Sequence, residues 1–483
     1  MKAFGNITKD GQVRAVASGA LTDGTAVIVN ADGTVSVVGE TSVSAGVGTK
    51  VVFENAATYR TSAVYDSNAQ KVVIAYADYG GSLNGDGTAI VGTVSGTSIS
   101  FGSPVTFSSD DAQQIATTFD STNNKVVIAF RDGSNSSYGT AIVGTVSGTS
   151  ISFGSATVYN SNITTHNSAA FDSNAGKVVI GFRNQTGSNL GKAIVGTVSG
   201  TSISFGSAVT FNNASTQRTA AVYDSNAQKV VISYRDLGDS NKGKSIVGTV
   251  SGTSISFGSA VEFNSNTNYI KSTYDSTNNK VIVVYSDGGN GDSGTAIVGT
   301  VSGTSISFGS EVVFHSGLVY ESTVNYDSST NKSVVAYRSS STTSGKIRVG
   351  TVSGTSISFD SEAEFESNTV NELSGVYDSS EEKIVLAYRD AGNSSYGTAI
   401  VFRNSATSTN ITSENFIGFS DGAYANTQSA AINTTNTIDR NQSGLTAGQT
   451  YFVQNDGTLG TTAADPSVTA GTAISATELI VKG

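Results

Sequence analysis

Apolar and small polar residues alternate along most of the chain, and one alternating segment recurs almost unchanged. Copies of VGTVSGTSISFGS, or close variants, begin at Val91, Val143, Val195, Val247, Val298 and Val349. The β-branched residues alternate with small polar ones and Ser-Gly-Thr supplies a tight turn, so each copy predicts a β-hairpin. The spacing of 51 or 52 residues between copies indicates a repeat architecture.

A second marker divides the chain into repeats: an aromatic residue and Asp, followed by a polar turn and a Lys-led apolar strand. Seven such pairs occur, at Tyr65-Asp66, Phe119-Asp120, Phe171-Asp172, Tyr223-Asp224, Tyr274-Asp275, Tyr326-Asp327 and Tyr377-Asp378. Each repeat can be written as four strands joined by turns. Repeats of about 52 residues with four strands predict an all-β fold, a seven-bladed β-propeller. A β-solenoid uses shorter coils, and immunoglobulin-like domains need about 100 residues each.

The two ends of the chain resemble each other and differ from the repeat. Residues 19–38 (GALTDGTAVIVNADGTVSVV) and 443–462 (SGLTAGQTYFVQNDGTLGTT) share a strand followed by an Asp-Gly-Thr hairpin turn. We therefore expect an N-terminal β-hairpin anchor at 1–49, the propeller at 50–418 and a C-terminal β-module at 419–483 that packs with the anchor.

The last repeat lacks the outer hairpin, so its sheet needs a strand from elsewhere. Val51–Glu54 resembles the second half of a fourth strand but has no third strand before it. We expect this N-terminal strand to complete the last repeat, which would leave no open edge there. The alternative is that residues 410–419 (NITSENFIGF) complete it.

Composition excludes several kinds of chemistry. The chain has 27 Lys and Arg against 38 Asp and Glu, so we expect no basic surface for nucleic acid or anionic lipid. Cysteine is absent, and the two histidines, His166 and His315, leave little material for zinc or imidazole chemistry. The N-terminus lacks the apolar core of a signal peptide, and no apolar segment approaches membrane-spanning length. We expect neither export by a signal peptide nor membrane insertion.

Variation is concentrated on one edge of the predicted sheets. The turns between first and second strands, and the Ser-Gly-Thr turns, hardly change, whereas the loops after the second and fourth strands differ in every repeat. Loops on a rigid scaffold often carry binding residues, so this edge is the candidate recognition surface; the alternative is that exposed loops simply vary. The candidate ligand-binding residues are Tyr59, Arg60, Tyr79, Tyr138, Arg218, Tyr269, Lys271, Tyr320 and Tyr396.

Arginine followed by a polar residue ends most of the second strands. The pairs are Arg131-Asp132, Arg183-Asn184, Arg235-Asp236, Arg338-Ser339 and Arg389-Asp390. A ring of arginines near the variable edge would suit the carboxylates of acidic sugars. The alternative is structural, with Arg and Asp bridging neighbouring repeats, and the recurrence of the pair favours it.

Two further kinds of site were considered, a calcium site and a catalytic carboxylate pair. Oxygen-rich loops that would suit Ca²⁺ contain Asp78, Asn84, Asp86, Asp287, Asn290 and Asp292, although turn formation explains the same residues. Candidate carboxylates for glycan processing are Asp110, Asp111, Glu321 and Glu372. No catalytic motif accompanies them and no metal-binding motif is complete, so the sequence predicts a protein that is not an enzyme and needs no cofactor.

The repeat resembles those of predicted virion structural or tail-fibre-like proteins of marine tailed bacteriophages, notably phages of cyanobacteria. The matching segments are residues 223–259, IGFSDGAYANTQSAAINT at 417–434, SGLTAGQTYFVQNDGTL from Ser443 and AGTAISATELIVKG from Ala470. The resemblance implies a virion protein attached to capsid, neck or tail through its terminal module, with loops that bind a host-surface glycan or protein. It equally allows a purely structural decoration or connector protein. It brings no catalytic residues.

Overall fold

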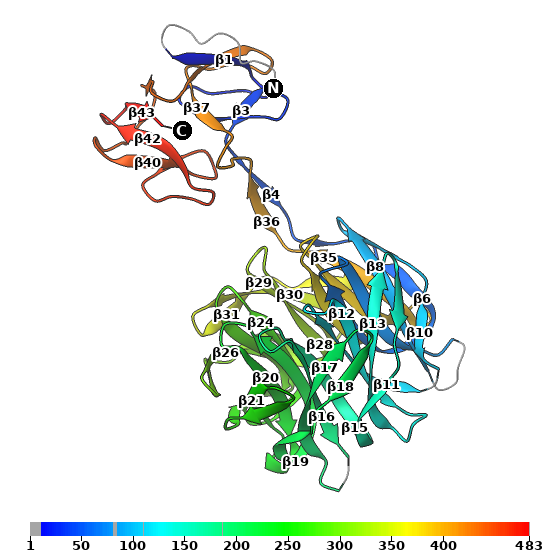
Figure 1. Ribbon diagram of the computed structural model, residues 1–483. Helices are drawn as coiled ribbons and strands as arrows, with labels where there is room; N and C mark the ends of the chain where they lie inside the picture. The colour runs from blue at the N-terminus through cyan, green and yellow to red at the C-terminus, as the bar shows by residue number, and fades with distance from the viewer. Residues whose placement is uncertain (1–10, 81–84, 110, 186, 483) are drawn as a thin grey trace. The chain divides into compact units, whose positions relative to one another are not determined.

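The computed structural model describes residues 11–80, 85–109, 111–185 and 187–482 (Figure 1). Strands form most of this part of the chain, and its only helical elements are two 3₁₀ turns, η1 (Leu237–Asp239) and η2 (Gly288–Asn290). Neither turn is long and apolar enough to cross a membrane. The chain divides into two units, residues 45–404, which contain the repeats, and residues 1–44 together with 405–483.

Each repeat forms an antiparallel sheet whose strands follow chain order. The first strands are β6 (Val51–Asp66), β11 (Ala112–Asp120), β15 (Thr157–Asp172), β19 (Val209–Asp224), β24 (Thr267–Asp275), β28 (Val312–Asp327) and β33 (Val370–Asp378). The second strands are β7 (Lys71–Asp78), β12 (Lys125–Asp132), β16 (Lys177–Asn184), β20 (Lys229–Asp236), β25 (Lys280–Asp287), β29 (Lys332–Ser339) and β34 (Lys383–Asp390). The third strands are β8 (Asp86–Ser95), β13 (Tyr138–Ser147), β17 (Leu190–Ser199), β21 (Lys242–Ser251), β26 (Ser293–Ser302), β30 (Gly345–Ser353) and β35 (Tyr396–Arg403).

The two sequence markers form the tight turns that they predict. In the recurring hairpin, Ser147 pairs with Ser150 around a Gly148-Thr149 loop, and Gly148 has a φ of +58° that glycine adopts without strain. In the aromatic-Asp marker, the buried Asp120 accepts hydrogen bonds from the backbone N–H groups of the turn that follows it. The side chain thereby satisfies donors that the turn leaves unpaired.

The fourth strand is broken into two parts. Its first part is the hairpin strand, β9 (Ser98–Phe101), β14 (Ser150–Phe153), β18 (Ser202–Phe205), β22 (Ser254–Phe257), β27 (Ser305–Phe308) or β31 (Ser356–Phe359). In the first, fourth and sixth repeats its second part is a separate strand, β10 (Val105–Ser108), β23 (Val261–Asn264) or β32 (Ala363–Glu366). Elsewhere, in β6, β15, β19 and β28, the second part continues into the next first strand. The loop expected there is therefore strand, because its backbone keeps pairing: Ile163 with Tyr138, then Thr164 with Asn184.

The N-terminal segment completes the sheet of the last repeat. In β5 (Gly46–Val47), Val47 lies opposite Phe402 of β35, and Val51 of β6 lies opposite Ala399 of the same strand. This confirms the strand assignment from sequence. The alternative was wrong, because Phe416 to Phe419 of β37 (Phe416–Ser420) pair with β2 (Ala26–Val29) in the other unit.

Apolar side chains from successive repeats pack together in the space between their sheets. Val127 of the second repeat, for example, shares a core with Ile180 of the third, and Ile74 of the first shares one with Val385 of the seventh. The first strands also contact one another in cyclic order, ending with β33 against β6. The repeats thus form a closed series of packed sheets, although no hydrogen-bonded sheet among the described strands closes on itself.

The unit formed by both chain ends contains two five-stranded sheets. One has the order β1 (Gln12–Val16), β38 (Ser429–Asn433), β37, β2 and β3 (Val35–Val37), and the other β39 (Ile438–Asp439), β43 (Leu479–Val481), β42 (Val468–Ala473), β40 (Thr450–Val453) and β41 (Leu459–Gly460). A further pair joins β4 (Glu40–Val43) to β36 (Ala406–Thr409). Asp32 and Asp456 make the same turn, each accepting from a backbone N–H at 2.9 Å and a Thr hydroxyl at 2.6 Å.

The unit boundaries lie at 44/45 and 404/405 rather than at 49/50 and 418/419. Strand β5 belongs to the last repeat through its pairing with β35, which moves the first boundary toward the N-terminus. Strands β36 and β37 pair with β4 and β2, which assigns the segment from residue 405 to the other unit.

Candidate functional site

A two-residue bulge interrupts the first strand of every repeat at the same place. The pairing with the second strand shifts register there, and the first residue of each bulge has a φ between 49° and 58°. Bulges re-aim side chains, and a positive φ outside glycine often marks a functional position. We call these seven the bulge residues: Arg60, Gln114, His166, Arg218, Tyr269, Glu321 and Glu372.

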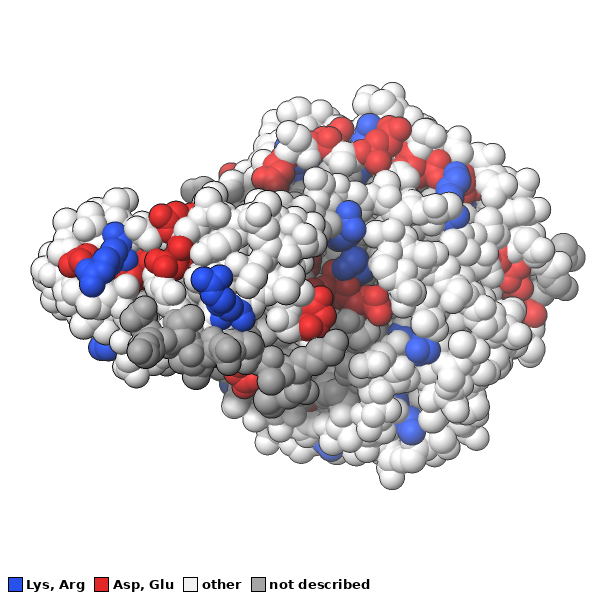
Figure 2. Space-filling view, turned by 90° about the horizontal axis from the view of Figure 1, so that it is seen from above, with Lys and Arg blue, Asp and Glu red and all other residues white. Residues whose placement is uncertain are grey.

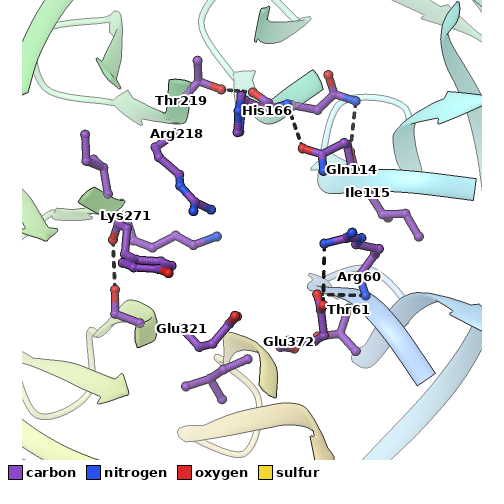
Figure 3. Close-up of a pocket in the computed structure, with 15 residues that line it drawn as sticks. Arg60, Thr61, Gln114, Ile115, His166, Arg218, Thr219, Lys271, Glu321 and Glu372 are labelled. Atoms are coloured by element: carbon purple, nitrogen blue, oxygen red, sulfur yellow. Dashed lines mark hydrogen bonds and ion pairs between the residues drawn. The ribbon is translucent and has the colours of Figure 1, made fainter. Parts of the chain in front are cut away.

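The bulge residues line one depression with a volume of about 180 Å³ (Figure 3). The residue that follows each bulge residue lines it too, and Lys271 adds a long side chain. A second cavity, of about 280 Å³, shares Lys271 and Thr219 with it. The bulges therefore bring side chains from seven repeats, far apart in sequence, to a single site.

Hydrogen bonds between neighbouring repeats hold the bulges in place. The side chains of Thr61, Asn167, Thr219 and Ser322 each donate to the backbone carbonyl of the bulge residue in the preceding repeat. At the other three junctions between neighbouring repeats, the equivalent residue is apolar: Ile115, Ile270 or Leu373. The four hydrogen bonds connect neighbouring bulges and fix the directions of the side chains that enter the depression.

Arg60 and Glu372 form an ion pair at the junction of the first and seventh repeats. The guanidinium lies 3.6 Å from the Glu372 carboxylate, which also accepts a hydrogen bond of 3.0 Å from the Arg60 backbone N–H. This pair neutralises one positive and one negative side chain of the depression.

Arg218 is held by contacts with the next repeat. Its Nε donates to Asn268 Oδ1 at 3.1 Å, and its guanidinium carbon lies 4.5 Å from the centre of the Tyr269 ring. Stacking on an aromatic face fixes the guanidinium plane and leaves its terminal amino groups directed toward the depression (Figure 3).

Lys271 and Glu321 have no ion pair or hydrogen bond from their charged groups to any residue that the structure describes. Surrounding protein lowers the pKa of Lys271; Glu321 opposes this effect and Arg218 adds to it. Solvent still reaches the Lys271 side chain, which is exposed and lines the depression. Burial, with the neighbouring Glu372 carboxylate, raises the pKa of Glu321.

His166 is uncharged at neutral pH. Burial lowers its pKa to about 3, and the positive charges of Arg218, Arg183 and Arg235 contribute. Its backbone N–H donates to Gln114 Oε1 at 2.8 Å. The side of the depression near His166 therefore has a positive field. By contrast, the molecular face in Figure 2 is mostly uncharged, with small mixed groups of acidic and basic residues.

The repeated arginines bridge repeats in a different way from the one expected. Arg389 lies 4.2 Å from the ring centre of Tyr59 in the first repeat, and Arg338 hydrogen-bonds to Asn371 in the seventh. The Asp residues beside the arginines instead close their own loops; Asp390, for example, accepts from Gly392 N at 3.0 Å. Where these aspartates form ion pairs, the partner is a lysine: Asp390 pairs with Lys50 at 3.0 Å and Asp236 with Lys244 at 2.9 Å.

The structure separates the nine candidate binding residues into three groups. Arg60, Arg218, Tyr269 and Lys271 line the depression. Tyr59 and Tyr79 form an edge-on ring pair at 4.9 Å, and Tyr320 packs edge-on against Tyr269 at 5.6 Å. Tyr138 and Tyr396 do not line the depression, because they begin the third strands and pair there with Asp132 and Asp390.

The calcium and carboxylate candidates are only partly described. Asn84 and Asp110 lie outside the described residues. Asp78 and Asp287 each accept a hydrogen bond from the glycine N–H two residues ahead, which is the contact of a turn. No group of three or more potential ligands for a metal occurs among the described residues. Glu321 and Glu372 do lie together in the depression.

Sequence reasoning did not select Gln114, Asn167 or Thr219. Their side chains have no common chemistry, so no motif identifies them. Their position does identify them: every bulge residue stands six positions, and the residue after it five positions, before the Asp of the aromatic-Asp pair.

Comparisons with known proteins give a fold but no family. No protein family model matches the chain, and no curated protein matches it. Its structure is similar to that of the BP39L lectin from Burkholderia pseudomallei, with a TM-score of 0.55 and 8% identity over 74% of this chain and 98% of that one. It also matches a triple arginine-to-alanine mutant of AofleA from Arthrobotrys oligospora, with a TM-score of 0.42 and 10% identity over 70% and 94% of the two chains. The first similarity shows a shared all-β fold.

Proposed function

We propose that the chain is a seven-bladed β-propeller that binds carbohydrate without chemical turnover, as a surface protein of a bacteriophage particle. The cyclic contacts of the first strands and the core shared by the first and seventh repeats support the propeller. The shared fold with a protein named as a lectin supports carbohydrate as the ligand class.

One observation carries the proposal: the repeats place different side chains at the equivalent positions that meet in the depression. The seven bulge positions hold five different residue types, whereas the hairpin sequence is nearly identical in six copies. If the bulges only held the repeats together, the same side chain could serve at every equivalent position. Different side chains that converge on one depression give a single asymmetric site, which suits a ligand with its own pattern of polar groups.

The chemistry of the depression suits a sugar. Arginine, lysine, histidine, glutamine and glutamate side chains supply both hydrogen-bond donors and acceptors to a space of about 180 Å³. The tyrosine pairs nearby offer amphipathic rings. A polyol with hydroxyl groups on all sides can use such a lining, whereas an apolar ligand would leave these groups unpaired.

The phage assignment rests on the resemblance of the repeat and of the C-terminal segments. In this proposal the unit formed by both ends attaches the protein to capsid, neck or tail, and the depression faces the host. Several copies on one particle would convert weak sugar binding into strong adsorption.

A purely structural virion protein is the second candidate, favoured by the extensive hydrogen bonding among the bulges. Glycan processing through Glu321 and Glu372 is a weaker one, because the Glu372 carboxylate is already paired with Arg60.

Binding of labelled protein to cyanobacterial host cells and to their isolated polysaccharides tests the proposal. The site variant would carry Arg60→Asn, Arg218→Asn and Glu321→Asn, since Asn tolerates a positive φ. A matched control exists at the other end of the first strands, where Gln70, Gln228 and Glu382 have φ of 55°, 55° and 58°; these would also be replaced by Asn.

Saturable binding by the wild type and the control, lost in the site variant, supports sugar recognition by the depression. Absence of wild-type binding to cells and polysaccharides favours the structural candidate. Release of sugar fragments by the wild type would point to an enzyme.

A further inference from the structure

Two of the three cations that line the depression, Arg218 and Lys271, lie close together, whereas Arg60 is paired with Glu372. Arg218 is anchored through Nε and its ring contact, and no described residue accepts a hydrogen bond from its terminal amino groups. The Lys271 ammonium projects into the same space (Figure 3). Two cations held close together destabilise each other unless an anion joins them. An anionic group of a ligand would satisfy both.

Lys271 is an exception among the repeats, which supports a dedicated role. The equivalent position in the other six repeats holds Ser62, Ala116, Ser168, Ala220, Thr323 and Ser374. Only the fifth repeat places a long charged side chain there. The fold therefore does not require lysine at this position, and the side chain ends in the depression rather than in a structural contact.

The carboxylates that line the depression disfavour a simple anion as the ligand. Glu321 has no partner among the described residues, and Glu372 lies beside it with Arg60. A free carboxylate repels a compact dianion such as phosphate but accepts hydrogen bonds from hydroxyl groups. The ligand must therefore present negative charge on one side and hydroxyl donors on the other.

We infer that the depression binds a sugar that carries a carboxylate, a uronic or sialic acid. The Arg218 guanidinium and the Lys271 ammonium hold the carboxylate, neutral His166 lies at the same side, and Glu321 accepts hydrogen bonds from ring hydroxyls. Arginine binds a planar carboxylate through two parallel hydrogen bonds, which gives direction as well as charge. This inference rests on the proposed sugar-binding function and narrows it to one ligand class.

Ligand-observed NMR and titration calorimetry on the full chain test it at millimolar sugar, where weak monovalent binding is measurable. The acidic probes are D-glucuronate, D-galacturonate and N-acetylneuraminate, the neutral probes D-glucose and D-galactose, and the simple anion is inorganic phosphate. We expect at least one acidic sugar to bind, and to bind at least tenfold more tightly than the neutral sugars and phosphate. Its affinity should fall as salt is raised.

Two substitutions that other repeats already contain keep the fold intact. Arg218→Gln copies Gln114, which has a φ of 52° in the second repeat, and Lys271→Ser copies Ser62. Each substitution should lower the affinity for the acidic sugar by about tenfold or more. The control Lys280→Ser removes the lysine that begins the second strand of the same repeat, outside the depression, and should leave affinity unchanged.

The outcomes separate this inference from the proposed function. Neutral sugars that bind as well as acidic ones, or full affinity in both substituted proteins, would overturn the carboxylate inference and leave sugar binding standing. If no sugar and no host polysaccharide binds, both are wrong. Selective binding of glucuronate or galacturonate would assign a uronic acid, and selective binding of N-acetylneuraminate a sialic acid.

Discussion

Gly206, at the end of one recurring hairpin, lies directly against the backbone carbonyl oxygen of Thr253 in the turn of the next hairpin. A Cβ at Gly206 would collide with that oxygen. The same close approach recurs at Gly102, Gly154, Gly258 and Gly309, and Gly48 makes it against Thr97 of the first repeat. The hairpin sequence is repeated because each copy has to fit against the next.

We expect Gly206→Ala to lower the free energy of unfolding by about 1–3 kcal/mol, because the carbonyl oxygen belongs to backbone and cannot move aside easily. Urea or thermal unfolding followed by circular dichroism measures this. Gly46→Ala is the control, since nothing lies within 4 Å of a Cβ built there. Equal stability of the two variants would show that the contact between hairpins is not restrictive.

One hairpin lacks this glycine, and it shows how far the sequence predicts the fold. Asp360 replaces glycine at the end of the sixth hairpin, and the seventh repeat has no recurring hairpin to pack against it. The hairpins, the turns at the aromatic-Asp pairs and the N-terminal strand of the last repeat follow from local patterns. The continuity of β15 from one sheet into the next does not, because pairing partners alone decide whether residues 160–164 form strand or loop.

The depression was only partly predictable for a related reason. Arg60, Arg218 and Lys271 were selected because charged residues in a variable segment are conspicuous. Gln114 has no such chemistry, and only its register in the bulge assigns it to the depression. Tyr138 and Tyr396 follow variable loops, yet strand pairing places them outside it.

Thr219→Val should lower the free energy of unfolding, because it removes a hydrogen bond between neighbouring bulges. The hydroxyl donates to the His166 carbonyl oxygen, and valine has the same shape without the donor. A buried carbonyl left without its partner costs about 1–3 kcal/mol. Chemical denaturation measures the loss. Ile270 is apolar at the equivalent position, so Ile270→Val is the control and should cost about 1 kcal/mol, the usual loss of one methylene. A neutral Thr219→Val would contradict a structural role for this hydrogen bond.

Glu321→Gln should stabilise the protein at neutral pH. Burial and Glu372 raise the pKa of Glu321, so the protonated form favours folding below the ordinary carboxyl pKa, and this contribution is lost as pH rises through the raised value. Glutamine resembles the protonated form at every pH. We expect Tm to rise by about 1–3 °C at pH 7 and the difference to shrink toward pH 4.

The control for this pH series is Glu364→Gln, because the Glu364 carboxylate is ion-paired with Lys346 at 2.8 Å. It should not raise Tm at pH 7. A Glu321→Gln protein that is less stable than wild type at pH 7 would show that the carboxylate serves the fold rather than a ligand.

Tyr269 should matter for binding because its ring carries the Arg218 guanidinium, 4.5 Å from the ring centre. Tyr269→Gln, which again copies Gln114, should weaken binding of an acidic sugar about twofold to thirtyfold, since cation–π contacts contribute roughly 0.5–2 kcal/mol. Tyr269→Phe keeps the aromatic face and should retain nearly full affinity. Calorimetry with the acidic sugar distinguishes the two. If phenylalanine weakens binding as much as glutamine does, the hydroxyl rather than the ring is the important group, and Arg218 is positioned by Asn268 alone.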